Sequence, residues 1–299
     1  MNDKAPSAPP RFTVFGQARA APRPEPALYL VATPIGNLGD VTLRALEIIA
    51  GADRLACEDT RVTGKLLQRF AIERRMTPYH EHNAEAAGPA LVEVVEAGGS
   101  VALVSDAGTP LVSDPGYRLV QSAYEAGIKV VPIPGASAVT TALLASGLPS
   151  DAFFFAGFLP QKEKARAERL EELVRVPGTL ILFEAPHRIA ASLAAMAAAF
   201  PDREAAVCRE LTKLHETIYR GPLPDLAARF AEMAEVRGEI VVCIAPPPAD
   251  GAASQADADE ILAGLLVEMK PTKAAQEAAR LTGLPRRDLY QRALEMKGK

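Results

Sequence analysis

The alternation of short apolar runs with amphipathic segments is the feature that most constrains how this chain can fold. LYLVAT (28–33), RLACE (54–58), VALVS (101–105) and IKVVP (128–132) are nearly continuous apolar runs, and segments with helical periodicity separate them. Strands buried on both faces have this continuous apolar character, and parallel strands need a crossover helix between them. The sequence therefore predicts a mostly parallel α/β domain over residues 27–150.

A different pattern begins after residue 150. AFFFA, TLILFE, AAVCR, ETIYR and EIVVCIA, all between residues 152 and 245, have the composition of strands. Several are separated by turns too short for a crossover helix, which favours antiparallel pairing. We expect residues 151–246 to form a second, α+β domain with a mixed sheet.

The two ends of the chain differ from the body. Residues 1–26 contain six prolines without sustained apolar periodicity, which predicts a disordered leader. Residues 247–256 have the composition of a linker. Residues 257–299 predict three helices, and LTGLP, with Gly283 as a cap and Pro285 as a start, indicates a helix-turn-helix-like module.

Charge is distributed unevenly along the chain. The 299 residues carry a formal net charge of -4, which gives no overall basic field of the kind that favours nucleic-acid binding. From Met269 onward, however, eight basic residues face three acidic ones, a local net charge of +5. This basic tail is either a solvated helical cap or a contact surface for nucleic acid, and charge alone leaves both open.

Compartment and membrane association follow from cysteine use and hydropathy. Cys57, Cys208 and Cys243 each lie in or beside an apolar run, as buried reduced thiols of a cytosolic protein do. No apolar run is long enough to span a bilayer. We therefore expect a cytoplasmic chain with no membrane partner.

The loops after the first two strands could hold a ligand. VATPIGNLGD (31–40) lacks the G-x-G-x-x-G dinucleotide pattern, and the TGKL stretch at 63–66 lacks the features of a P-loop. A tight structural turn explains the first loop at least as well as a ligand does. In ACEDTRVTGKLL (56–67), Asp59 or Thr60 suits a helix cap, but a cap does not explain Arg61.

The hexapeptide pattern Leu-Val-Ser-Asp-x-Gly occurs twice in LVSDAGTPLVSDPG (103–116). The first copy completes a strand, so we expect Asp106 and the amides around Gly108 to meet a ligand. The second copy suits a helix start, with Asp114 as the cap and Pro115 at the first helical position. The spacing does not predict a metal site in either copy.

Histidine spacing offers a weak metal signal at YHEHN (79–83), where His80 and His82 lack an evident third ligand. We expect no metal cofactor.

Polar residues follow three apolar strands of the second domain: Glu184, His187, Arg188, Glu210, Lys213 and Glu216. Any one of them could form an ordinary surface ion pair. Three such clusters in one domain favour a crevice.

Taken in order, the motifs resemble those of a known family. Their order along the chain resembles that of the ribosomal RNA small subunit methyltransferase I family of the tetrapyrrole methylase superfamily. The motifs that carry the resemblance are TPIGNLGDVTLRALE, EDTRVTGKLL, LVSDAGTPLVSDPGYRLV, VVPIPGASA, GFLPQK, FEAPHRI, RELTKLHET and GEIVV. The resemblance covers about residues 27–299 and leaves the proline-rich leader outside it.

The resemblance implies a two-domain tetrapyrrole-methylase-like α/β fold that binds S-adenosylmethionine between the domains, and a homodimer. It implies methylation of a cytidine ribose 2'-hydroxyl in the decoding region of small-subunit (16S) ribosomal RNA. We expect the assembled 30S subunit to be the substrate, and the sequence leaves naked RNA open as the alternative. The cofactor-binding residues that it implies are Thr33, Pro34, Gly36, Asn37, Ser105, Asp106, Ala107, Gly108, Thr109, Pro110, Gly135, Ser137, Ala138, Phe158, Glu239 and Ile240.

Catalytic and RNA-binding residues are a separate hypothesis. A 2'-hydroxyl is a poor nucleophile, and we expect Glu184 or His187 to act as its base, with Arg188 and Lys213 on the neighbouring phosphate. The residues expected to bind RNA are Arg61, Lys270, Lys273, Arg286, Arg287 and Arg292.

Two other functions fit part of the sequence. A methyltransferase acting on a tetrapyrrole or another small molecule would share the cofactor loops but leave the basic tail unexplained. A non-catalytic nucleic-acid-binding protein would use the tail but leave the strand-end loops unexplained.

Overall fold

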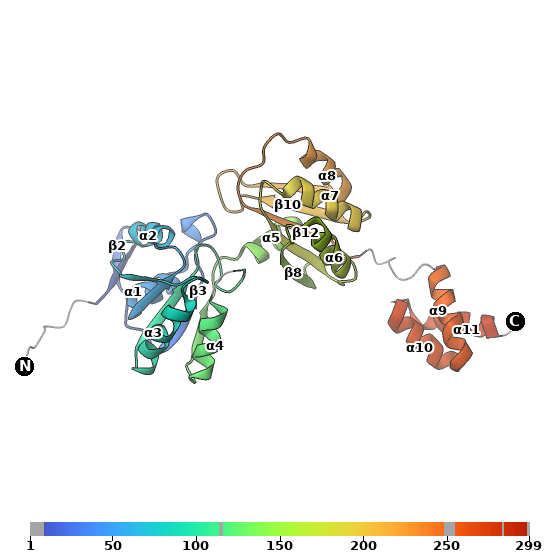
Figure 1. The fold of residues 1–299 in the computed structure, drawn as a ribbon, viewed down its shortest axis with the longest axis horizontal. Helices are drawn as coiled ribbons and strands as arrows, with labels where there is room; N and C mark the ends of the chain where they lie inside the picture. Colours follow the sequence, from blue (N-terminus) through green and yellow to red (C-terminus); the bar gives the residue numbers. More distant parts are fainter. Residues whose placement is uncertain (1–8, 114–115, 248–254, 283, 298–299) are drawn as a thin grey trace, which may run out of the picture.

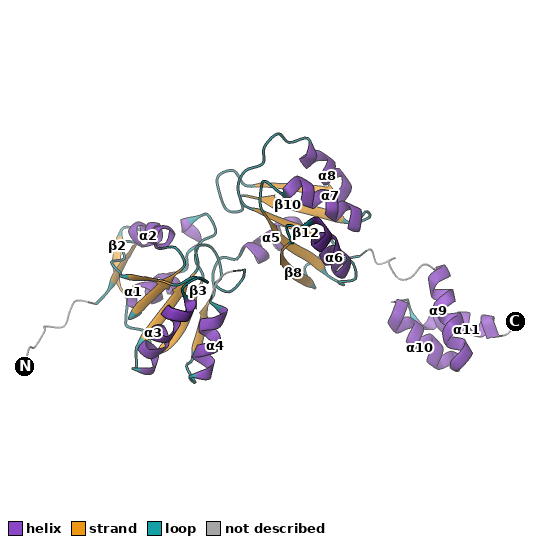
Figure 2. Cartoon of the chain, in the orientation of Figure 1, coloured by secondary structure: helices purple, strands orange, loops and turns teal. Residues whose placement is uncertain are grey.

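The computed structural model describes residues 9–113, 116–247, 255–282 and 284–297. In this part of the chain, two five-stranded sheets with helices on their faces are followed by a group of three helices (Figures 1 and 2).

The first sheet has the strand order β5-β4-β6-β3-β7, and every pair in it is parallel. Its strands are β3 (Ala27–Val31), β4 (Arg54–Cys57), β5 (Met76–Pro78), β6 (Ser100–Val104) and β7 (Val130–Ile133). Four of these strands and the parallel pairing were predicted. The short edge strand β5 was not, because MTP has no apolar run.

Helices cover both faces of the first sheet. One core joins the sheet to α1 (Leu43–Gly51) and α2 (Thr60–Arg69), and the other joins it to α3 (Ala84–Glu96) and α4 (Tyr117–Glu125). Thr42 is the N-cap of α1, and its hydroxyl accepts a hydrogen bond from the amide of Ala45. Asp114 and Pro115, the predicted start of α4, lie outside the described residues.

The N-terminal segment is more ordered than its proline content indicates. β1 (Arg11–Val14) and β2 (Gln17–Ala20) form an antiparallel hairpin, whose turn places Gly16 at a φ of 75°. Phe12 is buried in the same core as Leu46 and Ile49 of α1. The prediction of a disordered leader is therefore wrong for residues 11–20, because RFTVFGQARA provides an apolar anchor and a turn. Residues 1–8 lie outside the described part.

The second sheet has the strand order β11-β10-β12-β9-β8. Its strands are β8 (Phe153–Phe158), β9 (Thr179–Glu184), β10 (Glu204–Arg209), β11 (Thr217–Pro222) and β12 (Ile240–Ile244). β8 and β9 are parallel, and the other three pairs are antiparallel, which confirms the predicted mixed sheet.

Helices also cover both faces of the second sheet. α6 (Glu163–Leu173), α7 (Ile189–Ala199) and α8 (Leu223–Ala231) pack on one face. On the other face, α5 (Ala138–Ser146) buries Val139, Ala142 and Leu143 beside Cys208 and Cys243. The helix that follows the last strand of the first sheet thus belongs to the core of the second, and this brings the two sheets together.

Three helices form the C-terminal module, as predicted: α9 (Gln255–Glu268), α10 (Pro271–Thr282) and α11 (Arg286–Lys297). They pack on one another around a core that includes Leu262, Ala274 and Leu289. Gly283 and residues 248–254 of the predicted linker lie outside the described part.

Candidate functional site

Two adjoining cavities lie where loops of the first sheet meet loops of the second. The larger has a volume of about 390 Å³ and the smaller about 330 Å³, and Ile35, Ala107 and Glu239 line both. An isolated antiparallel bridge between Thr33 and Gly108 ties the loop after β3 to the loop after β6. Both volumes fall in the range typical of small-molecule sites.

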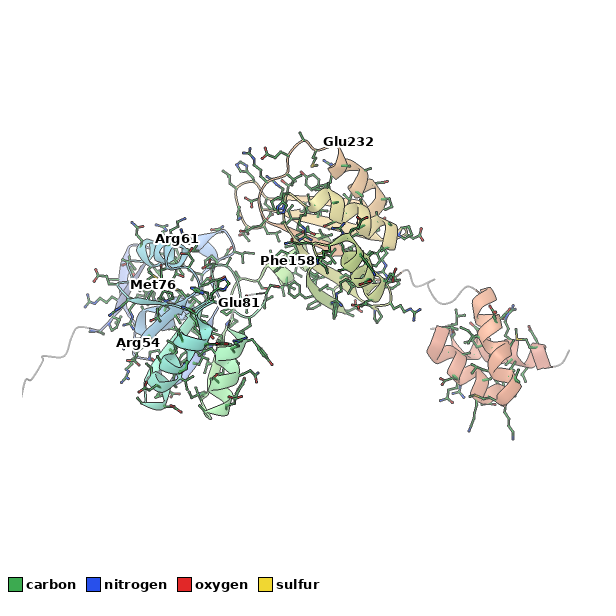
Figure 3. The ribbon with its side chains drawn as sticks, viewed as in Figure 1. Arg54, Arg61, Met76, Glu81, Phe158 and Glu232 are labelled. Atoms are coloured by element: carbon green, nitrogen blue, oxygen red, sulfur yellow. The ribbon has the colours of Figure 1, made fainter. Side chains whose placement is uncertain are left out.

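The larger cavity has mainly apolar walls. Phe158, Phe183, Leu211 and Val241 of the second domain line it, together with Gly108 from the first. The rings of Phe158 and Phe183 meet edge to face, with centroids 5.5 Å apart. Phe158 is 56% exposed and lies at the junction between the two domains (Figure 3).

The smaller cavity is bordered by charged groups. Lys65 on α2, Asp106 after β6 and Lys213 from the second domain line it, with the half-exposed side chains of Leu38 and Val62 as apolar walls. Lys65 is exposed and forms no ion pair with a described residue.

The predicted cofactor residues divide between the two cavities. Ala107, Gly108, Thr109, Ser137, Ala138, Phe158, Glu239 and Ile240 line the larger one. Thr33, Pro34, Gly36, Ser105, Asp106, Ala107 and Glu239 line the smaller one.

Three predicted cofactor residues line neither cavity. The Asn37 side chain accepts a hydrogen bond from the amide of Gly39 and caps a short 3-10 helix. Gly135 lets its turn lie against Ala32, whose Cβ would be 2.9 Å from an added Cβ. Pro110 is buried in the loop after β6. These residues shape the loops.

Glu184, predicted as a base, is sealed from the cleft. Its side chain is 0% exposed and forms an ion pair with Arg188, whose Nε lies 3.3 Å from Oε1. Ser192 Oγ donates a short hydrogen bond to Oε2, and the Ala185 amide donates to Oε1 at 2.8 Å. The carboxylate is thus fully engaged, although the residue borders the larger cavity.

His187 and Arg188, predicted to act beside Glu184, lie outside the two cavities. His187 is exposed and lines neither cavity. Arg188 donates a hydrogen bond of 2.8 Å to the carbonyl oxygen of Leu159, and so supports the GFLP loop from within the second domain. The roles predicted for these two side chains in catalysis and phosphate binding stay predictions.

Lys213 connects the two domains. Its Nζ lies 2.8 Å from Oε1 of Glu210 and 3.2 Å from Oε2 of Glu239. Its aliphatic carbons cover Gly36, where an added Cβ would lie 2.5 Å from Cγ of Lys213. Gly36 and Lys213 therefore fix the wall of the smaller cavity.

Backbone strain is concentrated in the loops around the cleft. Six described non-glycine residues have positive φ, and Leu111, Ser113, Glu210 and Thr212 are four of them. These residues lie in the loop after β6 and the loop after β10. Strained backbone of this kind is characteristic of functional sites.

Two carboxylic acids near the smaller cavity have perturbed ionisation. Burial raises the pKa of Asp106, and the charge of Asp59 adds to this. Burial and the nearby Asp106 raise the pKa of Glu58. By contrast, hydrogen bonds from Arg61 lower the pKa of Asp59 to about 2. Perturbed acids beside a cavity are candidates for catalysis.

Most of the predicted RNA-binding residues are accessible. Arg61 has 88% of its side chain exposed at the start of α2 and pairs with Asp59 at 2.6 Å (Figure 3). Lys270, Lys273, Arg286 and Arg287 are exposed on the C-terminal module. Arg292 instead pairs with Asp259, its Nε donating to Oδ1 at 2.7 Å, and links α11 to α9.

Neither a metal cluster nor a membrane span is present among the described residues. The rings of His80 and His82 are 5.9 Å apart, but no group of three potential ligands occurs in the described part. No described helix is both long and apolar enough to cross a membrane.

The sequence reasoning missed Leu38, Val62 and Lys65, which line the smaller cavity. Lys65 lies one helical turn after Arg61, on the helix that begins at the carboxyl end of β4. That spacing was the available signal, because residues four apart share a helix face.

Two family models match this chain. The tetrapyrrole (corrin/porphyrin) methylases match residues 27–227, and the RsmI C-terminal HTH domain matches residues 252–297. The first match covers the first sheet and most of the second, ending within α8 before β12, and the second match covers the helical module.

Curated relatives match over nearly the whole length. A protein of Mesorhizobium japonicum named ribosomal RNA small subunit methyltransferase I is 58% identical, over 95% of this chain and 97% of its own. Proteins with the same name from Vibrio cholerae and Escherichia coli O157:H7 are 47% and 45% identical, over 94% of this chain and 98% and 99% of theirs.

Solved structures share the fold of the body. A diphthine synthase has a TM-score of 0.57 at 18% identity, covering 73% of this chain and 89% of its own. The methyltransferase CobJ has a TM-score of 0.55 at 19% identity, covering 74% and 94%. With the family matches and the curated relatives, this shows that the chain belongs to the tetrapyrrole methylase family and, within it, to the ribosomal RNA small subunit methyltransferase I family.

Proposed function

We propose that this chain transfers the methyl group of S-adenosylmethionine to small-subunit (16S) ribosomal RNA, at the ribose 2'-hydroxyl of a cytidine in the decoding region. The observation that carries the proposal is similarity, over nearly the entire length, to relatives named ribosomal RNA small subunit methyltransferase I. That similarity includes both the cleft and the helical module.

The larger cavity suits S-adenosylmethionine. The cofactor combines a flat aromatic base with polar groups and a positively charged sulfonium. Phe158, Phe183 and Leu211 offer an apolar slot for a flat base, and Glu239 supplies a carboxylate at the border with the smaller cavity. Gly108, with a φ of 85°, lets the backbone approach closely.

The chemistry requires positioning above all. When bound, S-adenosylmethionine supplies a methyl group on an already activated leaving group. The protein then has to hold the hydroxyl oxygen in line with the methyl carbon and take up its proton. A cleft with two adjoining cavities provides one place for each reactant.

The exposed basic residues suit a phosphate backbone. Lys270, Lys273, Arg286 and Arg287 present four cations on the helical module, and Arg61 adds another at the cleft. Phosphate contacts of this type release counterions, so the resulting affinity falls as salt rises. The basic tail is thus explained better as an RNA contact than as a solvated cap.

We also propose a cytoplasmic homodimer that acts on the assembled 30S subunit. This follows from the family and from the target, since small subunits are assembled in the cytoplasm. Light scattering of the purified chain tests the dimer, and a monomer at assay concentration would contradict it.

Methyl transfer tests the function directly. The chain is given S-adenosylmethionine with a labelled methyl group and either small subunits, naked ribosomal RNA or a porphyrinoid. We expect label in the RNA of the subunits, at a cytidine 2'-O position identified by mass spectrometry. Label in the porphyrinoid alone would favour a small-molecule methyltransferase, and subunit binding without transfer would favour a non-catalytic binding protein.

The helical module has a separate prediction. Replacing Arg286 and Arg287 with Ala removes two exposed cations, so the slope of log affinity against log salt for small subunits should fall by about 1 for each lost phosphate contact. Filter binding across a salt series measures this slope, and cofactor affinity should not change. The double substitution Lys164→Ala and Arg169→Ala on α6 is the control. An unaltered slope in the Arg286 and Arg287 variant would exclude these two arginines as phosphate contacts.

A further inference from the structure

The smaller cavity differs from the larger in the chemistry of its walls. It has two lysines, a half-buried carboxylate and exposed apolar side chains, but none of the aromatic residues that line its neighbour. Lysines suit phosphates, a carboxylate suits a hydroxyl and apolar walls suit a ribose and base. This combination matches a ribonucleotide.

We propose that the smaller cavity receives the target nucleotide and that Asp106 accepts the proton of its 2'-hydroxyl. The inference rests on the proposed function, and it assigns the acceptor site and the base within it. It replaces the cofactor contact that the resemblance implied for Asp106, which lines the smaller cavity and not the larger.

Position is the first argument for Asp106. Ala107, its neighbour in the chain, lines both cavities, so Asp106 lies at the boundary across which a methyl group has to pass. Oδ1 of Asp106 accepts a hydrogen bond of 3.0 Å from the amide of Asp59. This bond orients the carboxylate and leaves its other oxygen for a substrate hydroxyl.

The surroundings of Asp106 support the role. Burial raises its pKa, and a base is more effective when its pKa is nearer to the operating pH. The hydrogen bond from the Asp59 amide and the charge of Arg61 lower the pKa of Asp106, and the charge of Asp59 raises it, but burial is the largest of these effects. The charged groups that surround Asp106 from the neighbouring elements are Glu58, Asp59, Arg61, Lys65, Lys213 and Glu239.

In this proposal Lys65 and Lys213 bind the phosphates next to the target nucleotide. Lys65 is exposed and forms no ion pair with a described residue, so its charge is available to an RNA phosphate. Lys213 is held by Glu210 and Glu239 at a fixed place in the wall. One lysine is therefore adjustable and the other is fixed.

The proposed step balances. The O–H bond of the 2'-hydroxyl breaks and its proton passes to the Asp106 carboxylate. The hydroxyl oxygen bonds to the methyl carbon while the carbon–sulfur bond breaks. The electron pair of the broken carbon–sulfur bond stays on the sulfur, so the sulfonium becomes a neutral thioether.

Asp106→Asn tests the base. Asn retains an oxygen that can accept the Asp59 amide, so the loop should keep its structure. We expect kcat on small subunits to fall by roughly 10²- to 10⁴-fold, with cofactor affinity and Tm unchanged. In the wild-type chain kcat should rise with pH as Asp106 ionises, and this rise should be absent from the residual activity of the variant.

Val62→Trp tests the cavity. A Trp side chain would occupy the space between Val62 and Lys65, so KM for small subunits should rise while cofactor affinity stays the same.

Asp202→Asn is the control for Asp106→Asn. It is the same substitution at an exposed residue just before β10, and it should leave kcat and its pH profile unchanged.

The outcomes separate this inference from the proposed function. If the wild-type chain methylates small subunits and Asp106→Asn retains its full kcat and pH profile, the role of Asp106 is overturned. If Val62→Trp weakens cofactor binding and leaves KM for subunits unchanged, the acceptor cavity is overturned. If the wild-type chain transfers no methyl group to subunits or RNA, the proposed function itself fails.

Discussion

The two halves of the cleft place similar residues in opposite settings. On the first sheet, Asp106 follows β6, half-buried beside a cavity, with a raised pKa. On the second sheet, Glu184 ends β9 with its side chain fully buried, and Arg188 and Ser192 bind its carboxylate. Both are acids at the end of an apolar strand, yet only Asp106 is accessible to a substrate.

The proposed role of Asp106 places the reactive group in the first half, whereas the second half provides a mainly apolar wall. A buried pair such as Glu184 and Arg188 holds the GFLP loop in place through the bond from Arg188 to Leu159. Substitutions in the second half should therefore affect folding and binding, and those in the first half should affect the reaction and the approach of the reactants.

Glu184→Gln should give the largest effect. It removes one charge of a buried pair and leaves the Arg188 guanidinium, whose side chain is 17% exposed, without its partner. Breaking such a pair costs about 3–5 kcal/mol of unfolding free energy, which urea denaturation measures. Glu172→Gln removes the exposed partner of Arg169 on α6 and should cost at most about 1 kcal/mol. Equal losses in the two variants would contradict the contrast between sealed and exposed carboxylates.

Gly108→Val comes second and acts where the two cavities meet. The residue has a φ of 85°, and an added Cβ would lie 3.2 Å from Cγ2 of Ile35. Its branched side chain would enter the larger cavity, so we expect cofactor affinity to fall about 100-fold, or about 2.8 kcal/mol. Isothermal titration calorimetry measures this change.

Gly127→Val is the matched control for that substitution. Gly127 also has a positive φ, 68°, but no atom lies within 4 Å of an added Cβ. It should lose stability of about 1–2 kcal/mol through strain and retain its cofactor affinity. A similar loss of affinity in both variants would mean that strain, and not obstruction of the cavity, is responsible.

Sequence patterns predicted the sheets better than the side-chain environments. Continuous apolar runs identified four strands of the first sheet, because burial on both faces leaves a local signature. Strand-like composition identified the five strands of the second sheet, although β8 and β11 are partly exposed. The hairpin at 11–20 was missed because its stability depends on Phe12 reaching the core beside α1, a contact between distant segments.

The candidate site shows the same limit. Local motifs located the loops after β3, β6 and β8, and most of the predicted cofactor residues line one cavity or the other. Sequence position alone could not reveal that Glu184 points at Ser192 on α7, eight residues later, or that Lys65 joins Lys213 from the other domain. Such placements depend on tertiary packing.

Phe158→Ala should have a smaller effect than Gly108→Val. It removes an aromatic wall of the larger cavity but introduces no obstruction, and Phe183 remains. We expect cofactor affinity to fall about tenfold, or about 1.4 kcal/mol. Phe153→Ala, at the exposed start of the same strand and outside both cavities, is the control in the same calorimetric titration. An unchanged affinity for Phe158→Ala would move the apolar slot elsewhere.

The smallest effect is expected at the amino ends of the strands of the first sheet, where Asp53 precedes β4. Its carboxylate accepts hydrogen bonds of 2.8 Å from both the amide and the hydroxyl of Ser100, and one of 3.0 Å from Nε of Arg23. Burial acts to raise the pKa of Asp53, but these bonds outweigh it and the pKa is lowered. The first sheet thus has Asp53, with a lowered pKa, at the amino ends of its strands and Asp106, with a raised pKa, at their carboxyl ends.

Because the pKa of Asp53 is lower in the folded chain than in the unfolded one, its contribution is complete above the ordinary value of about 3.9 and is lost as pH falls through the folded value. Asp53→Asn should therefore cost about 1 kcal/mol at neutral pH. The difference from the wild type should shrink toward zero in acid, as measured by urea denaturation at several pH values. With Asp202→Asn as control, a cost for Asp53→Asn that persists in acid would mean that the lost hydrogen-bond acceptor, and not the charge, is responsible. In that case the lowered pKa of Asp53 and the raised pKa of Asp106 would not distinguish a stabilising role at one end of the strands from a catalytic role at the other.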